Sequence, residues 1–128
     1  MIDLCLFDFD NTLLMTDDLC DIRLQGKGKM NDDGVDSEYV RELRRRADDI
    51  KRRLIFTQTE LTAIRKKFPK MKFGLFTRAP AAYIWIMDNM AFPDFFWDTV
   101  ICYESITNGL FKPNGYGIHA AMEGPAQI

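Results

Sequence analysis

The chain has 128 residues, of which 47% are hydrophobic and 28% charged, and its formal net charge is −2. These values are typical of a single globular domain, and the small charge gives no general attraction to nucleic acid or to anionic membranes. No apolar stretch approaches the roughly 18 residues of a membrane-spanning helix. The three cysteines, Cys5, Cys20 and Cys102, lack the spacing of a zinc site or a disulfide framework. We therefore expect a cytoplasmic protein without nucleic-acid or membrane partners.

The first 55 residues predict one strand and one clear helix. Ile2 to Phe7 is a short apolar run that predicts a buried strand. Residues 13–24 are compatible with a helix, and the glycine-rich stretch 25–36 is typical of a loop. Ser37 can cap a helix. Apolar residues then recur every three or four positions as far as Leu54, which predicts one helix over this stretch.

The rest of the chain alternates between helix and strand. Thr57 and Glu60 match a capping box, which predicts the start of a helix. Strands are predicted over 71–76 and 99–102, with a helix from Pro80 to about Met90 between them and a last helix from Pro113 to about Met122. Such alternation is typical of parallel strands joined by crossover helices. We therefore expect an α/β, Rossmann-like, three-layer core with a parallel sheet over residues 1–15 and 56–128, and a short helical, cap-like insertion over residues 16–55.

Four polar residues follow the predicted strands. Asp8 and Asp10 come after the first strand, Thr77 after the second and Lys112 after the third. Ligands of an open parallel sheet bind at the carboxyl ends of its strands, so these residues are expected to meet in one crevice. Together they suit phosphoryl transfer. One carboxylate can attack phosphorus and a second can move a proton, while a hydroxyl and an ammonium hold the phosphate oxygens. Mg²⁺ would offset the repulsion between the acids and the phosphate.

Three segments carry a resemblance to a known family. Residues 6–13 (LFDFDNTL), 73–78 (FGLFTR) and 109–113 (GLFKP) resemble, in order, the first three motifs of the haloacid dehalogenase-like (HAD) hydrolases. The resemblance implies that Asp8 is the nucleophile and Asp10 the general acid and base. It also implies that Mg²⁺ is bound by the Asp8 side chain and the Asp10 carbonyl. The phosphate-binding residues would be Asn11, Thr77, Arg78 and Lys112.

The chain departs from the family pattern in two respects. No fourth motif, whose acidic residues would complete the Mg²⁺ site, precedes Ile128, and Glu123 is the only acid after Lys112. The chain thus resembles a family member truncated before that motif. The insertion is also short for a cap, which leaves the crevice open to a phosphoprotein as well as to a small phosphorylated molecule.

The sequence therefore predicts a Mg²⁺-dependent phosphomonoester hydrolase that works through an aspartyl-phosphate. The main alternative is a catalytically inactive or truncated HAD-like module that binds a partner or phosphate without turnover. A receiver-like phosphoacceptor domain is less compatible, because its acceptor aspartate usually follows a later strand.

Overall fold

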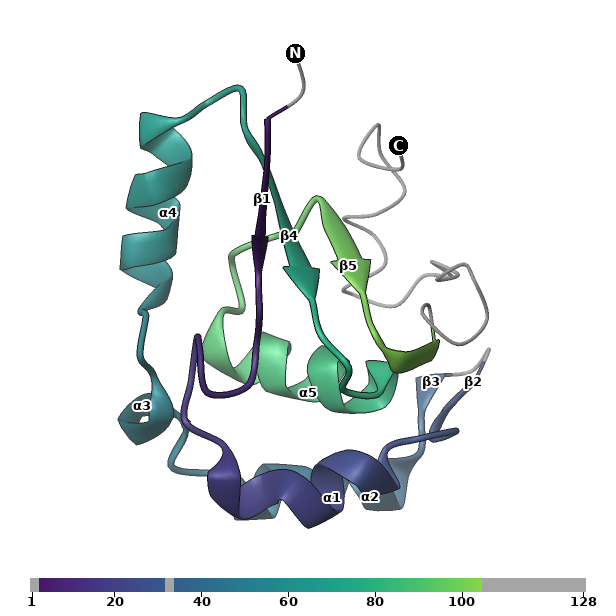
Figure 1. The fold of residues 1–128 in the computed structure, drawn as a ribbon. Coiled ribbons are helices and arrows are strands. Elements are labelled where there is room, and N and C mark those ends of the chain that lie inside the picture. Colours follow the sequence, from purple (N-terminus) through teal and green to yellow (C-terminus); the bar gives the residue numbers. More distant parts are fainter. Residues whose placement is uncertain (1–2, 32–33, 105–128) are drawn as a thin grey trace.

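The computed structural model describes residues 3–31 and 34–104, in which helices and strands alternate around one parallel sheet (Figure 1). The strands are β1 (Leu4–Phe7), β2 (Met30–Asn31), β3 (Gly34–Val35), β4 (Lys72–Phe76) and β5 (Thr99–Ile101). The helices are the 3₁₀ turn η1 (Asp17–Leu19) and α1 (Cys20–Gln25), α2 (Ser37–Arg46), α3 (Ile50–Arg53), α4 (Gln58–Lys67) and α5 (Ala81–Ala91).

The main sheet has the order β1-β4-β5, and both of its pairings are parallel. Leu4 lies opposite Lys72, and Gly74 of the middle strand lies opposite Thr99. The Thr99 side chain of the neighbouring strand lies close to the backbone of Gly74. A Cβ atom at Gly74 would lie 2.5 Å from Cγ2 of Thr99, so glycine allows this close approach. Helix α4 precedes β4 and α5 connects β4 to β5, so the predicted α/β Rossmann-like fold with a parallel sheet is confirmed.

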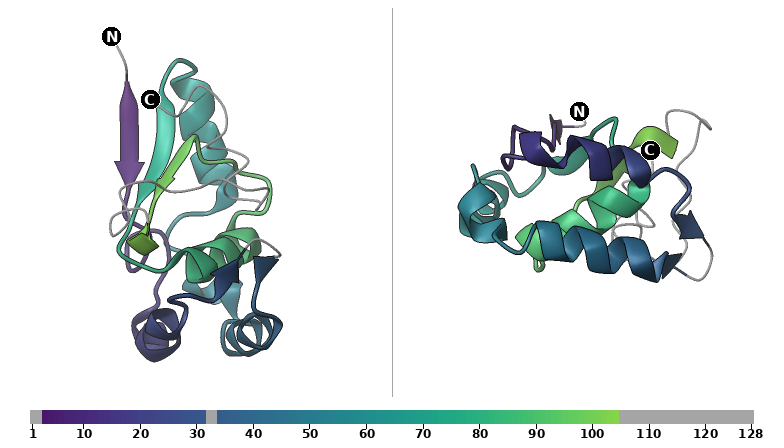
Figure 2. Two further views of the ribbon diagram at one scale, coloured as in Figure 1. Left: turned by 90° about the vertical axis from the view of Figure 1, so that its right-hand side faces the viewer. Right: turned by 90° about the horizontal axis from the view of Figure 1, so that it is seen from below.

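Both crossover helices lie on the same side of this sheet (Figure 2, left). On that side Phe73 and Leu75 are fully buried, whereas Leu4, Leu6 and Phe76 on the other side are 42–47% exposed. The expectation that the first strand is buried is therefore wrong for one of its faces. In the described part of the chain, β1 is an edge strand and helices cover one side of the sheet. The third layer predicted for the core is not present among the described residues 3–31 and 34–104.

Aromatic side chains pack on the side of the sheet that α4 and α5 cover, where Arg65 of α4 lies over Phe73 and Phe95. Phe7 stacks on Phe73 with ring centroids 6.2 Å apart, and it meets Trp97 edge-on at 5.6 Å. Phe95 packs edge-on against Phe73 and, at 4.8 Å, against Trp97. Such offset and edge-to-face pairs are the favoured aromatic arrangements, and they fix the loop before β5 against the sheet.

The insertion leaves and rejoins the core at one point. Leu14 pairs antiparallel with Leu54, and the Met15 amide donates to the Arg53 carbonyl at 2.7 Å. We call this pairing the neck. From it, α1 and α2 extend across the carboxyl ends of the strands (Figures 1 and 2), and α2 and α3 contact α5.

Arginines form the ion pairs that join the segments of the insertion. Arg53, only 8% exposed, donates to both carboxylate oxygens of Asp18 (2.6 and 2.7 Å) and to Asp49 (2.7 Å). Arg46 donates to Asp21 at 2.8 Å. The insertion is thus closed by ion pairs that connect η1 and α1 to α2 and α3.

A contact between α1 and α2 sets their spacing. The Tyr39 hydroxyl donates to the Ile22 carbonyl at 2.8 Å. It passes so close to Gly26 that a Cβ atom at that position would lie 2.7 Å from the hydroxyl oxygen. Glycine therefore allows this close approach of the two helices.

The helix predicted from residue 37 to residue 54 differs from the structure at its start and in its middle. Asp36, not Ser37, is the cap, and its carboxylate accepts the Tyr39 amide at 3.0 Å. The helix also breaks after Arg46, because the following Asp48-Asp49 pair disfavours a helix interior. Residues 25–36, expected to be a loop, include the short antiparallel pair β2 and β3.

In the ambiguous stretch 13–24, helical structure begins at Asp17. The helices and strands predicted between residues 57 and 102 agree with the structure within a residue or two. The Thr57–Glu60 capping box is present at the start of α4, and β4, α5 and β5 lie where the sequence places them. Among the described residues, none of the three cysteines forms a disulfide. None of the described helices is long and apolar enough to cross a membrane. The helix predicted over 113–122 lies outside the described residues.

Candidate active site

The loop after β1 is held by its own hydrogen bonds. The Leu13 amide donates to the Phe9 carbonyl (2.9 Å) and the Asn11 amide to the Leu14 carbonyl (2.7 Å). Asn11 adopts a left-handed backbone with φ of 61°, which asparagine tolerates better than most residues. This tight turn brings Asp8 and Asp10 to the carboxyl end of the sheet.

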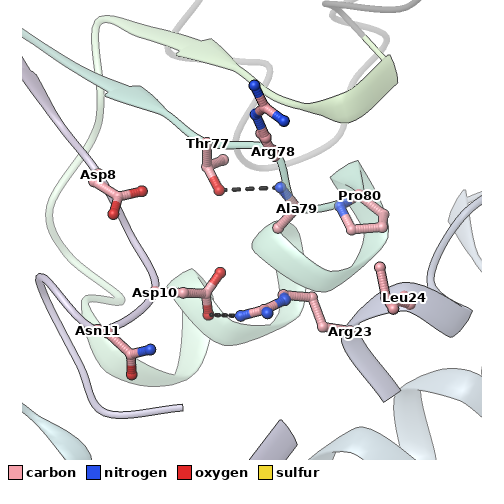
Figure 3. Close-up of a pocket in the computed structure, with 9 residues that line it drawn as sticks. All are labelled: Asp8, Asp10, Asn11, Arg23, Leu24, Thr77, Arg78, Ala79 and Pro80. Atoms are coloured by element: carbon pink, nitrogen blue, oxygen red, sulfur yellow. Dashed lines mark hydrogen bonds and ion pairs between the residues drawn. The ribbon is translucent and has the colours of Figure 1, made fainter. Parts of the chain in front are cut away.

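Asp8 is exposed and lightly bonded. The Thr12 hydroxyl donates to its Oδ2 atom at 3.1 Å, and in the described residues no hydrogen bond involves its Oδ1 atom. Figure 3 shows the carboxylate facing Thr77 across the pocket. Asp8 therefore presents a free oxygen to any group bound between these two side chains.

Asp10 is more buried and is held by three donors. Its Oδ1 atom accepts hydrogen bonds of 2.7 Å from the hydroxyls of Thr16 and Tyr83, and it lies 3.4 Å from Nη1 of Arg23. Burial, and then the Asp10 charge, raises the pKa of Tyr83 well above its usual range, so its hydroxyl keeps the proton it donates. The other oxygen of Asp10 points towards the side of Asp8 and Thr77 (Figure 3).

Thr77 and Arg78 come from the end of the middle strand. Thr77 is almost completely buried, and its amide continues the sheet by donating to the Ile101 carbonyl at 2.8 Å. Its Oγ1 atom accepts the Ala79 amide at 3.1 Å, which leaves the hydroxyl proton for a ligand. Arg78 is exposed, and its guanidinium turns away from the two carboxylates (Figure 3).

These residues line one pocket of about 350 Å³ at the carboxyl ends of β1 and β4 (Figure 3). Its lining comes from the β1 loop, from α1 of the insertion and from the turn before α5. The lining residues are Asp8, Asp10, Asn11, Arg23, Leu24, Thr77, Arg78, Ala79 and Pro80. Five of the six site residues predicted from the sequence thus surround one hollow, and the sixth, Lys112, lies outside the described residues.

Asn11 differs from the other predicted phosphate ligands. Its side-chain oxygen accepts the Thr16 amide at 2.9 Å, and its side-chain nitrogen donates to Asp17 at 2.6 Å. The amide group therefore stabilises the loop, and binding phosphate would require these bonds to break.

Three residues around Asp10 were not anticipated. Thr16 and Arg23 belong to a stretch whose secondary structure the sequence left open, and Tyr83 falls in a helix that its apolar neighbours identify only as core. No local motif marks them, because they reach Asp10 through tertiary packing. Arg23 could have been suspected as the one basic residue in the first turns after the D-x-D segment.

The sequence predicts that Mg²⁺ is bound by the side chain of Asp8 and the carbonyl of Asp10. The part of the chain that the structure describes contains no cluster of three or more His, Cys, Asp or Glu residues suited to a metal. The two expected ligands are nevertheless compatible with Mg²⁺, which often takes one or two protein oxygens and keeps several waters. Asp8 offers an exposed carboxylate. The described backbone hydrogen bonds of the loop use the carbonyls of Phe9, Leu13 and Leu14, and none uses that of Asp10.

Comparisons with protein-family models, with curated proteins and with solved structures found no match to this chain.

Proposed function

We propose that this protein is a phosphomonoester hydrolase of the HAD-like kind, with Asp8 as its nucleophile. One observation carries the proposal. Asp8 and Asp10 lie about 70 residues from Thr77 in sequence, yet all three line the same 350 Å³ pocket. A strand-end crevice that combines two carboxylates with a hydroxyl donor has the groups that phosphoryl transfer requires.

In the first step, an Asp8 oxygen attacks phosphorus and the bond from phosphorus to the leaving-group oxygen breaks. The leaving oxygen takes a proton from the carboxyl group of Asp10. Since three donors occupy Oδ1 of Asp10, the proton is carried by Oδ2. The products are an aspartyl-phosphate and a free alcohol.

In the second step, Asp10 removes a proton from water, whose oxygen attacks the phosphorus of the aspartyl-phosphate. The bond to Asp8 breaks, which regenerates the carboxylate and releases inorganic phosphate. The Thr77 hydroxyl donates to a phosphate oxygen throughout. A Mg²⁺ ion held by the Asp8 side chain and the Asp10 carbonyl would offset the negative charge that gathers at this site.

The decisive experiment measures hydrolysis of p-nitrophenyl phosphate by the wild type and by Asp8→Asn, with and without Mg²⁺. We expect Mg²⁺-dependent turnover that Asp8→Asn lowers by at least ~1,000-fold, because the amide is not a nucleophile. Asp94→Asn is the matched control, since Asp94 is exposed and uses only its backbone in the described hydrogen bond to Gln58. Mass spectrometry after an acid quench should find a phosphoryl group on Asp8 of the wild type.

Equal turnover by the wild type and Asp8→Asn would contradict the proposal. No turnover by the wild type, together with binding of inorganic phosphate that Thr77→Val weakens, would instead support the alternative of a module that binds phosphate without catalysis.

A further inference from the structure

Arg23 brings a positive charge from the insertion into the pocket. It belongs to α1, whereas the carboxylates belong to the β1 loop of the core, and its side chain is 22% exposed. A guanidinium stays protonated throughout the physiological pH range, even when it is partly buried. The pocket therefore contains a permanent cation supplied by the insertion.

This cation is incompletely used by the protein. In the described residues, Nη1 approaches Asp10 at 3.4 Å, longer than a good charged hydrogen bond, and Nη2 makes a weak contact with the sulfur of Cys20. A guanidinium is a planar fork of five N–H donors that matches carboxylate and phosphate groups. Donors of Arg23 are thus available to an anionic ligand.

The position of Arg23 indicates which part of a ligand it would meet. In Figure 3, Asp8 and Thr77 face each other at one end of the pocket, and Arg23 lies beyond Asp10, beside Leu24. If the transferred phosphate occupies the Asp8–Thr77 end, then the leaving group extends past Asp10 towards Arg23.

We propose that Arg23 selects substrates whose leaving group carries a second anionic group, so that the natural substrate is a small phosphomonoester with a carboxylate or a second phosphate. This inference rests on the proposed function, because that function places the transferred phosphate next to Asp8. A pocket of about 350 Å³ roofed by α1 accommodates a molecule of this size, and this favours a small substrate over a phosphoprotein.

The test measures binding, so it does not depend on turnover. The affinities of ethylphosphonate, phosphonoacetate and methylenediphosphonate are determined by calorimetry on the full chain, with excess Mg²⁺ in every sample. The first ligand has a neutral tail, the second adds a carboxylate and the third adds a second phosphonate. We expect the wild type to bind one of the two doubly anionic ligands at least ~10-fold more tightly than ethylphosphonate, as a good charged contact provides. The more tightly bound of the two ligands shows whether the second anionic group of the substrate is a carboxylate or a phosphate.

The variant Arg23→Gln should lose this preference while keeping its affinity for ethylphosphonate within about threefold. Arg23→Lys should retain part of it, because the charge remains but the planar fork is lost. Arg44→Gln, on the exposed face of α2, is the matched control and should behave as the wild type.

Two results would overturn the inference. One is a wild type that binds all three phosphonates equally or binds none of them. The other is an Arg23→Gln variant that weakens all three equally, which would mean that Arg23 acts only through Asp10. Failure of the proposed function looks different. In that case the wild type would discriminate among phosphonates in an Arg23-dependent way yet would not hydrolyse p-nitrophenyl phosphate.

Discussion

The core and the insertion share one hydrophobic cluster, but the insertion adds ion pairs between its own segments. On the helix-covered side of the sheet, Phe73, Phe95 and Trp97 are buried, and the half-buried Phe7 contacts two of these rings. In the insertion, Arg46 and Arg53 join segments through ion pairs whose acidic partners are largely exposed. The insertion also buries Leu19, Ile22 and Leu43 completely in the same hydrophobic cluster as the core. The core should therefore respond mainly to cavities, whereas the insertion should respond to salt and pH as well.

The largest effect expected from this difference is that of Trp97→Ala. Trp97 is 1% exposed and contacts two of the aromatic rings, so its loss leaves a cavity and should lower the free energy of unfolding by about 3–5 kcal/mol. Urea denaturation measures this change. Phe96→Ala is the matched control, because Phe96 is adjacent in sequence and 62% exposed, and its effect should stay within about 0.5 kcal/mol. Similar losses in the two variants would contradict the role given to the cluster.

A second experiment tests the acid buried inside the core. Asp88 is 6% exposed and accepts the Trp97 indole N–H at 2.8 Å. Burial raises its pKa to about 7, against the opposing effect of that hydrogen bond. Because the folded-state pKa lies above the unfolded-state value of 3.8, the folded state binds the proton more tightly. Stability should therefore fall as the pH rises from about 4 to about 7, and then level off.

Asp88→Asn removes this titration and keeps an oxygen acceptor for Trp97. We expect the variant to be more stable than the wild type at pH 8 by about 2 kcal/mol, since one pKa unit corresponds to about 1.4 kcal/mol and the new amide N–H offsets part of the gain. Urea unfolding at pH 5 and pH 8 measures the difference. If the wild type and Asp88→Asn lose stability in parallel over this range, another group is responsible.

The smallest of these effects is expected in the insertion, for Arg53→Gln. Its main partner, Asp18, is 64% exposed, so the free energy of unfolding should fall by only about 1–2 kcal/mol, and less at high salt. The Arg53 hydrogen bond lowers the pKa of Asp18 to about 2. The contribution is therefore fully present above about pH 4 and is lost as the pH falls towards 2.

Amide hydrogen exchange measures where Arg53→Gln loosens the structure. We expect exchange to become faster only in residues of the insertion. Arg45→Gln, which removes a surface pair with Glu42, should change stability by less than about 0.5 kcal/mol. A loss that is insensitive to both salt and pH would mean that Arg53 acts through packing.

The alternating pattern of the sequence was sufficient to predict the sheet. The runs ending at Phe7 and Phe76, together with the Thr57–Glu60 box, correctly locate β1, β4 and the start of α4, because hydrophobic periodicity and capping are local signals. Which face of the sheet is covered is set by packing between distant segments, so the exposure of Leu4 and Leu6 on the uncovered face could not be read from the run itself.

In the candidate site too, some residues could be placed from the sequence and others could not. The convergence of Asp8 and Asp10 with Thr77 follows from the geometry of parallel strands, since strand ends of one sheet share an edge. The donors around Asp10 do not follow from it. Tyr83 reaches Asp10 across 73 residues, and Arg23 does so only because α1 lies over the crevice, so both depend on packing of the insertion and α5 that no short motif encodes.

The neck also has a consequence for the order of folding. Leu4 and Lys72, which begin the β1–β4 pairing, are separated by a long loop, and the Leu14–Leu54 pairing lies inside that loop. Once the neck has closed, the chain that must still be looped to bring β1 to β4 is shortened by more than half. The entropic cost of loop closure then falls by roughly 0.8 kcal/mol. A two-residue contact outside the sheet therefore makes nucleation of the sheet easier.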